Sequence, residues 1–284
     1  MMEVARLSDA KRALAVVGDS LDAAGAEGEL SFGILRRLVA EPDAWGDEVV
    51  ILVGVSSGSP AALVTMTGAH PALIVGFTDI GSAGFGDLVV AMLGTGRRPE
   101  GVNGARRWSE PFAHAWREIA GATADVRRDV RAFELHEVRR PRMPAGRFRP
   151  ATPEDHELLE GWAVAFGADI AEPMTRADAA RQVARLVAAD DLAVWDLDGR
   201  LVSMAAVVRR TPRSSTIALV YTPPELRGRG FASAAVAELS QRELDAGQHR
   251  CSLFTDIANP TSNHIYAAIG YQPKCDFRHY SLAW

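Results

Sequence analysis

The stretch Val220-Tyr-Thr-Pro-Pro-Glu-Leu-Arg-Gly-Arg-Gly-Phe-Ala232 decides the predicted fold. Its apolar start predicts a strand over 216–222, which Pro223-Pro224 ends because proline cannot continue a sheet ladder. Apolar residues at helical spacing predict a helix over 231–246 beyond the loop. A strand, a tight loop and a helix in this order direct several backbone N–H groups and the positive end of the helix dipole toward one place.

The loop between this strand and this helix has the composition of an anion site. Gly228 and Gly230 have no side chain, so an anion can approach the backbone closely. Arg227 and Arg229 add positive charge. The Gly-Lys-Ser/Thr sequence of a Walker loop does not follow, and the glycine spacing differs from the dinucleotide fingerprint. The loop therefore predicts a diphosphate site that needs no metal ion.

The residues before the loop predict two helices and a hairpin. Helices are predicted over 152–166 and 175–188, because each range opens with a capping box in which a threonine precedes an aspartate. Asp198-Gly199 is a two-residue hairpin turn that joins strands predicted over 192–195 and 201–208.

The residues after the loop complete a predicted α/β domain. A strand over 251–255 and a short helix over 261–269 come first, with Gly270 as the C-terminal cap of that helix. Two short strands are expected to finish the chain. The sequence thus predicts a mixed, mostly antiparallel sheet flanked by helices over 148–284.

A second motif, Asn259-Pro-Thr-Ser-Asn-His-Ile-Tyr266-Ala-Ala-Ile-Gly-Tyr271, lies on that short helix. Together with the loop, it resembles the GNAT superfamily of acetyltransferases. The family's loop signature is Gln/Arg-x-x-Gly-x-Gly/Ala, which Arg227, Gly230 and Ala232 match. The resemblance implies that the chain is an enzyme that binds acetyl-CoA and transfers the acetyl group directly to an amine, with no covalent enzyme intermediate.

The resemblance also implies roles for individual residues. The strand end would pair with the pantetheine arm through backbone groups, as an added strand does. The loop amides would hold the pyrophosphate, and an asparagine would hydrogen-bond the pantetheine arm. The implied cofactor-binding residues are Val220, Tyr221, Thr222, Arg227, Gly228, Arg229, Gly230, Phe231, Ala232 and Asn259.

Tyr266 is the implied catalytic residue, placed near the sulfur atom. A phenol with a pKa of about 10 can donate a proton to the thiolate that leaves when an amine attacks the thioester. The alternative is a core tyrosine on a short helix. The general base is Asp256, Asp169, Glu172 or a water molecule, and Asn263 either caps the helix or contacts the cofactor.

The first half of the chain is a weak echo of the second. Gly81–Gly86 followed by an apolar helix over 87–93 resembles the loop at 227–232 and its helix, which predicts a tandem duplication. The predicted domains are a degenerate GNAT-like domain over 1–138, a linker over 139–147 and the catalytic domain over 148–284. No positively charged residue occurs over 81–86, so the first domain is expected to be structural or to shape the acceptor site. The linker is interpreted as a solvated connector. The alternative is that its arginines form a phosphate-binding patch.

Composition narrows the function classes. The formal net charge of -5 and the pI of about 5.8 argue against nucleic acid and anionic membranes as partners. The two cysteines, Cys251 and Cys275, fit a reducing compartment. No leader pattern and no apolar run long enough for a membrane helix occur, so a cytoplasmic protein is expected. The expected partner is a small-molecule or peptide amine acceptor, with no metal.

Three other interpretations of the sequence are weighed against this one. Gly54-Val-Ser-Ser-Gly58 spells a hydrolase nucleophile elbow, but strand-like residues follow it where the elbow needs a helix, so a hairpin turn is predicted. A non-catalytic acyl-CoA sensor would keep the cofactor site without turnover. A transferase with another donor, such as a longer acyl-CoA or aminoacyl-tRNA, is the third, and the acidic composition weighs against tRNA.

Overall fold

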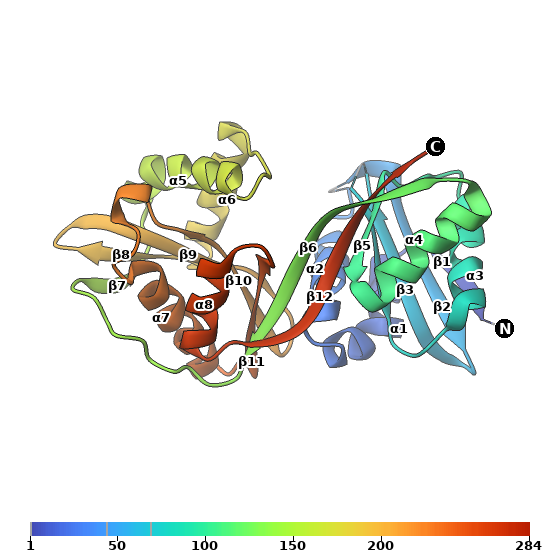
Figure 1. Cartoon of the computed structure of the whole chain (residues 1–284), viewed down its shortest axis with the longest axis horizontal. Coiled ribbons are helices and arrows are strands. Elements are labelled where there is room, and N and C mark those ends of the chain that lie inside the picture. The colour runs from blue at the N-terminus through green and yellow to red at the C-terminus, as the bar shows by residue number, and fades with distance from the viewer. Residues whose placement is uncertain (1, 44, 69) are drawn as a thin grey trace. The chain divides into compact units, whose positions relative to one another are not determined.

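The structure is a computed structural model that describes residues 2–43, 45–68 and 70–284. The chain forms two compact units (Figure 1). The N-terminal unit contains Met1–Ala132, Thr255–Ala258 and Pro273–Trp284, and the C-terminal unit contains Phe133–Phe254 and Asn259–Gln272. Each unit is an α/β fold with helices on both faces of a mixed, mostly antiparallel sheet, as the sequence predicts.

The N-terminal unit has the sheet order β1-β2-β3-β4-β5-β12-β6. Among the described residues, β4 and β5 run parallel, whereas β1 and β2, β2 and β3, β3 and β4, and β5 and β12 run antiparallel. One apolar layer lies under α1 and α2, and another under α3 and α4. Its elements are β1 (Glu3–Leu7), α1 (Ala10–Ala23), α2 (Ala26–Ala40), a short 3-10 helix (Gly46–Glu48), β2 (Val49–Ser56), β3 (Ser59–Thr67), β4 (Ala72–Gly76), α3 (Gly81–Gly94), β5 (Gly101–Ala105), α4 (Arg106–Ala120), β6 (Thr123–Leu135, whose end lies in the other unit) and β12 (Gln272–Ala283).

The C-terminal unit has the sheet order β11-β10-β9-β8-β7, in which β10 and β11 run parallel and the other neighbours run antiparallel. In Figure 1, α5 and α6 cover one face of this sheet, and α7 and α8 cover the other. Its elements are β7 (Arg147–Pro150), a short 3-10 helix (Pro153–Asp155), α5 (His156–Asp169), α6 (Arg176–Ala188), β8 (Leu192–Leu197), β9 (Arg200–Arg210), β10 (Ser214–Tyr221), a second 3-10 turn (Pro224–Leu226), α7 (Phe231–Asp245), β11 (Arg250–Asp256) and α8 (Pro260–Ile269).

Local signals placed most boundaries of the C-terminal unit. Thr152 and Asp155 form the predicted capping box, and the Thr175 side chain accepts a hydrogen bond from the Asp178 amide. Asp198 and Gly199 both have positive φ, as a tight hairpin turn between β8 and β9 requires. These predictions are confirmed.

The hairpin prediction for Gly54-Val-Ser-Ser-Gly58 is also confirmed. Ser57 and Gly58 have positive φ, and they join β2 to β3, with no helix between the two strands. The hydrolase interpretation is therefore wrong, because the nucleophile elbow needs a strand-to-helix turn.

Two predictions about boundaries are wrong. The glycines of Gly81–Gly86 do not form a loop, because α3 already begins at Gly81. The chain also ends in the single strand β12, not in two short strands. Neither glycine nor proline occurs over 274–283, so nothing interrupts that strand.

The last strand lies in a different unit from the elements that precede it in sequence. β12 pairs antiparallel with β5, with Tyr280 opposite Val102, so it completes the sheet of the N-terminal unit. The compact units thus differ from the predicted ranges 1–138 and 148–284 at this strand. Within the described residues, no helix is both long and apolar enough to cross a membrane.

Candidate active site

The end of β10 is shaped differently from its start. The parallel ladder joins 214–216 of β10 to 250–252 of β11, although the two strands continue to Tyr221 and Asp256. A register shift between Ala218 and Tyr221 marks a bulge, and Leu219 within it has a positive φ of 53°. A bulge bends a strand and increases its twist, so the end of β10 diverges from β11.

The loop after β10 leaves the start of α7 without a side-chain cap. Gly228 and Gly230 have φ of 76° and 83°, which favours glycine. Gly230 is the N-cap of α7, no side chain accepts from the first amides, and the first turn contains no acidic residue. A Cβ on Gly228 would meet nothing within 4 Å, so the space beside the loop is open. An uncapped helix start of this kind is able to bind an anion through its backbone N–H groups and the helix dipole.

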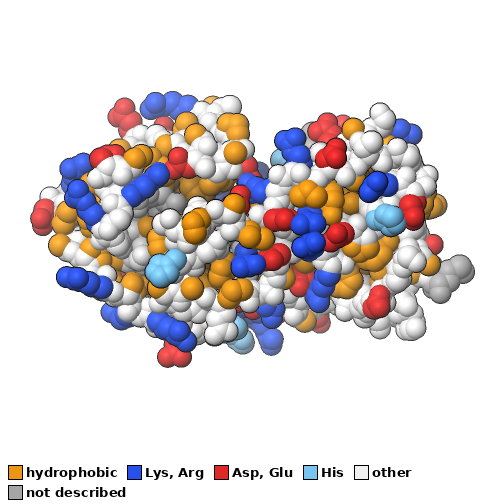
Figure 2. Space-filling view, in the orientation of Figure 1, with side chains coloured by type: hydrophobic (Ala, Val, Ile, Leu, Met, Phe, Trp, Pro, Cys, Tyr) orange, Lys and Arg blue, Asp and Glu red, His pale blue; other side chains and the backbone are white. Residues whose placement is uncertain are grey.

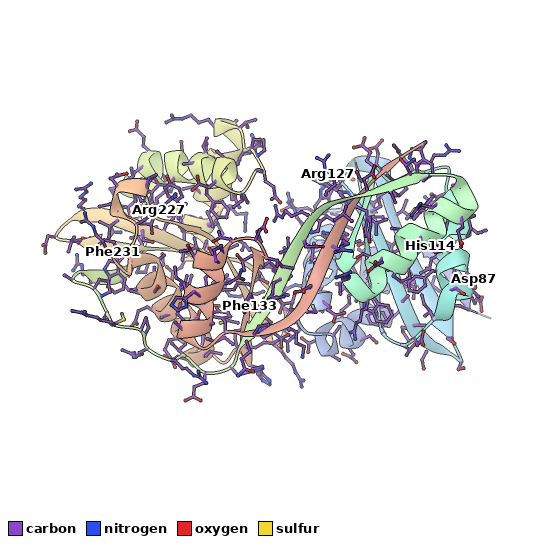
Figure 3. All side chains as sticks on the ribbon, in the orientation of Figure 1. Asp87, His114, Arg127, Phe133, Arg227 and Phe231 are labelled. Carbon is purple, nitrogen blue, oxygen red and sulfur yellow. The ribbon has the colours of Figure 1, made fainter. Side chains whose placement is uncertain are left out.

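Arg227, which is labelled in Figure 3, makes hydrogen bonds to two other parts of the chain. Its Nε donates to the carbonyl oxygen of Thr222 at 2.9 Å, and its NH2 group donates to Oδ2 of Asp169 at 2.6 Å. Its guanidinium also lies 5.8 Å from the ring centroid of Tyr221. The side chain of Arg227 thus joins the loop to the end of β10 and to the end of α5. The neighbouring Arg229 is exposed.

The predicted strand residues are also held from within the sheet. Ser203 of β9 donates to the carbonyl oxygen of Tyr221 at 3.0 Å and lies 2.9 Å from Oγ1 of Thr222. The Tyr221 ring packs on Trp162, with centroids 5.9 Å apart, and burial followed by the Asp169 carboxylate raises the pKa of its phenol. Val220 is half-buried against the core under α7 and α8.

Asn259 is the N-cap of α8. Its side-chain oxygen accepts from the Ser262 amide at 3.0 Å, which leaves the side-chain N–H₂ as the donor for another group. The Asn263 side chain donates to the Asn259 backbone oxygen at 2.8 Å. This hydrogen bond fits a place in the cap of α8, and contact with the cofactor stays a prediction.

Tyr266 of α8 is buried, and its ring lies in the core beneath α7. It contacts Phe133 and Tyr271, with ring centroids 6.4 Å and 6.0 Å away. Burial raises the pKa of its phenol to about 12. Burial therefore makes this phenol a weaker acid than an exposed tyrosine, and like any tyrosine it is protonated at neutral pH.

The three candidate bases lie in different settings. Asp169 is paired with Arg227, and both side chains are 49% exposed. Asp256 accepts a hydrogen bond from the Ala258 amide at 2.7 Å. Glu172 is exposed in the connection between α5 and α6. Among the described residues, no group of three His, Cys, Asp or Glu side chains is placed to bind a metal ion.

Sequence reasoning missed Ser203 and Trp162, which hold the end of β10. Ser203 carried a signal, because it is a polar residue within the apolar run 201–208. A buried hydroxyl normally finds a hydrogen-bond partner. Trp162 carried no signal beyond its place on an apolar helix face.

The equivalent position of the N-terminal unit is closed. The short connection from β4 to α3 places the Asp79 carboxylate on the amide of Gly81, at 2.9 Å. Trp108 at the start of α4 packs against the end of β4, where a Cβ on Gly76 would lie 2.6 Å from Cε3 of its indole. The indole N–H donates to Glu27 at 2.9 Å. A carboxylate thus occupies the helix start, and an indole covers the strand end.

Comparison with known proteins shows which folds this chain resembles. The family model for FR47-like proteins matches residues 197–280. An acetyltransferase from the GNAT family of Colwellia psychrerythraea superposes with a TM-score of 0.66 at 8% identity, over 99% of this chain and 100% of that one. A GCN5-related N-acetyltransferase from Sphaerobacter thermophilus gives 0.65 at 18% identity, over 98% and 94% of the two chains.

A tandem GNAT protein from the clavulanic acid biosynthesis pathway gives a TM-score of 0.58 at 15% identity, over 100% of this chain and 98% of that one. The comparison with curated proteins gives no match. The predicted resemblance to the GNAT superfamily is confirmed. More particularly, the chain has the fold of a tandem GNAT protein, with two GNAT-like α/β folds in one polypeptide.

Proposed function

We propose that the C-terminal unit binds acetyl-CoA and transfers its acetyl group to the amine of a small molecule or a peptide. One observation carries this proposal: the diverging end of β10 leads into a glycine loop and an uncapped α7. The backbone amides of 227–232 and the helix dipole would hold the diphosphate. The strand end at 220–222 and the free N–H₂ of Asn259 would hold the pantetheine arm.

The chemistry proposed is one direct transfer. The amine nitrogen forms a bond to the thioester carbon, and the carbon–sulfur bond then breaks, so coenzyme A leaves as a thiolate. Tyr266, which lies on the helix that Asn259 caps, is the proposed donor of the proton that the thiolate takes up. The amine loses a proton to water or to a carboxylate. Because Asp169 is committed to Arg227, we favour water, Glu172 or Asp256 as the acceptor of that proton.

The experiment that tests the proposal has two parts. Calorimetry with acetyl-CoA measures whether the chain binds the thioester. Release of free thiol during incubation with a panel of small amines and peptides, followed by mass spectrometry of the products, measures whether it transfers the acetyl group. We expect micromolar binding and acetylation of at least one class of amine, and a chain that neither binds nor consumes acetyl-CoA contradicts the proposal.

A non-catalytic acyl-CoA sensor is the second candidate. The contacts that favour it are those that hold polar groups of the site within the chain: Arg227 is bound to Asp169, and the Tyr266 ring packs between other aromatic rings. A sensor would bind acetyl-CoA as tightly as the enzyme but release thiol no faster than the uncatalysed reaction.

A further inference from the structure

The segment 139–146, called the strap below, is fixed on the C-terminal unit. The Arg139 amide donates to the Ile269 carbonyl oxygen at 2.7 Å. The Trp195 indole donates to the Ala145 carbonyl oxygen at 2.9 Å, and Arg140 pairs with Glu238 of α7 at 3.6 Å. In Figure 1 the strap runs beneath α7 and α8 toward β7. The sequence interpretation as a solvated connector does not account for these contacts.

The middle of the strap approaches the glycine loop. A Cβ placed on Gly230 would lie 3.9 Å from the backbone oxygen of Arg142, and no other atom outside its chain neighbours lies within 4 Å of it. Arg142 is exposed. Since an arginine side chain extends several ångströms from its backbone, the Arg142 guanidinium can reach an anion that lies against the amides of Gly230 and the first turn of α7.

The arginines of the loop do not balance the negative charge of coenzyme A, so a further positively charged side chain is expected near the loop. Arg227 is committed to Asp169 and to the Thr222 carbonyl oxygen. The loop contains one other arginine, Arg229, to offset the charge of the phosphates. Figure 2 shows basic side chains along the lower edge of the C-terminal unit, where the strap runs in Figure 1. A coenzyme A molecule carries a diphosphate and a 3′-phosphate, which together hold more negative charge than one arginine offsets.

We propose that Arg142 of the strap binds a phosphate group of coenzyme A, so that the strap forms one wall of the nucleotide site. This inference rests on the proposed function, because it assumes that the loop at 227–232 binds the cofactor. Arg142 acts on binding only. It does not touch the reacting atoms, and its guanidinium pairs with a phosphate oxygen by charge-assisted hydrogen bonds.

The test is a calorimetric comparison of the whole chain with two ligands, coenzyme A and 3′-dephospho-coenzyme A. We expect Arg142→Ala to weaken coenzyme A binding by about tenfold, the usual scale for a hydrogen bond to a charged group. Arg142→Lys should recover part of the loss. Arg147→Ala is the matched control, because Arg147 ends the same linker and pairs with Asp196 at 3.8 Å. It should change the affinity less than twofold.

Salt and the second ligand separate a phosphate contact from a structural effect. Binding by the wild type should weaken with ionic strength more steeply than binding by Arg142→Ala, since screening acts on the charge pair. A loss confined to coenzyme A assigns Arg142 to the 3′-phosphate, and an equal loss with both ligands assigns it to the diphosphate. Arg142→Ala within twofold of the wild type on both ligands overturns the inference. If the wild type itself binds neither ligand, the proposed function fails as well.

Discussion

The connection from strand to helix differs between the two units in one chemical respect. In the N-terminal unit, Asp79 puts its own carboxylate on the amide of Gly81 at the start of α3. In the C-terminal unit, the loop brings Gly230 to the start of α7 and no side chain caps it. An internal carboxylate satisfies the amide that an anion would use, and it repels a phosphate. One carboxylate before the helix thus distinguishes the start of α3 from the proposed anion site at the start of α7.

The ends of the strands before these helices also differ between the two units. β4 ends at Gly76, against which the Trp108 indole packs, while β10 ends in a bulge that turns it away from β11. The N-terminal unit thus covers its strand end with an indole, whereas in the C-terminal unit a Cβ on Gly228 of the loop after β10 would meet nothing within 4 Å. This comparison supports one cofactor site per chain, and the following experiments test it from the largest expected effect to the smallest.

Tyr266→Phe should lower kcat by about 10²-fold or more, the usual scale for a positioned general acid. The affinity for acetyl-CoA should change little, because the ring stays in place. In the N-terminal unit, α4 follows β5 as α8 follows β11, and α4 contains no tyrosine. Steady-state kinetics with calorimetry of acetyl-CoA binding measures both quantities.

Tyr271→Phe is the control for this experiment. The Tyr271 hydroxyl lies 2.8 Å from Oγ of Ser240 in the same core, so its removal should cost stability and leave kcat near the wild-type value. If Tyr266→Phe leaves kcat within about twofold while lowering stability, its hydroxyl is structural.

Gly230→Asp should weaken acetyl-CoA binding by at least about 2–3 kcal/mol, because it adds a side chain and a negative charge where the diphosphate is proposed to lie. Gly81→Asp makes the matched change at the start of α3, where φ is also positive at 58° and a Cβ meets nothing within 4 Å. It should leave the affinity unchanged. Equal losses in the two variants, measured by calorimetry, would contradict a difference between the units.

The stability of the fold should fall at alkaline pH partly through Tyr266. Its pKa is about 12 in the folded chain, against about 10 in an unfolded one. Below pH 10 the phenol is neutral in both states and contributes no pH dependence. As the pH rises toward 12, only the unfolded chain ionises, so up to about 2–3 kcal/mol of stability is lost.

Urea unfolding between about pH 9 and 11.5 measures this loss, and Tyr266→Phe should fall less steeply than the wild type. Parallel curves for the two proteins would show that the Tyr266 phenol titrates normally in the folded chain.

Asp169→Asn should have the smallest effect. Its pair with Arg227 is half-exposed, so screening by solvent limits the loss of stability to about 1 kcal/mol or less. If Asp169 is only a partner of Arg227, kcat and its pH profile stay near those of the wild type. A tenfold fall in kcat together with the loss of the acidic limb of the pH–rate profile would identify Asp169 as the general base instead.

Local signals in the sequence predicted the C-terminal unit well. Capping boxes, the Asp198-Gly199 turn and the Gly270 cap each depend on neighbouring residues, so their pattern is visible without the fold. The motif at 227–232 likewise predicted a loop followed by a helix. Its role as a cofactor site stays a prediction, as do the roles of Asn259 and Tyr266.

Contacts between distant parts of the sequence could not be predicted in this way. Arg227 was assigned to the cofactor from its motif, yet its side chain pairs with Asp169 of α5. The Trp108 indole against Gly76 and the pairing of β12 with β5 depend on which strands become neighbours. The start of α3 was misplaced because Gly81–Gly86 has a loop-like composition, while the residue that fixes the helix start is Asp79 before it.

The most direct test of the account is the number and place of coenzyme molecules on the whole chain. Calorimetric titration with acetyl-CoA should give one molecule per chain, and a crystal structure of the complex should show it beside 220–232 with its diphosphate on the amides before α7. Two molecules per chain, or a cofactor beside Gly81 at the start of α3, would contradict the central claim that only the C-terminal unit keeps the site.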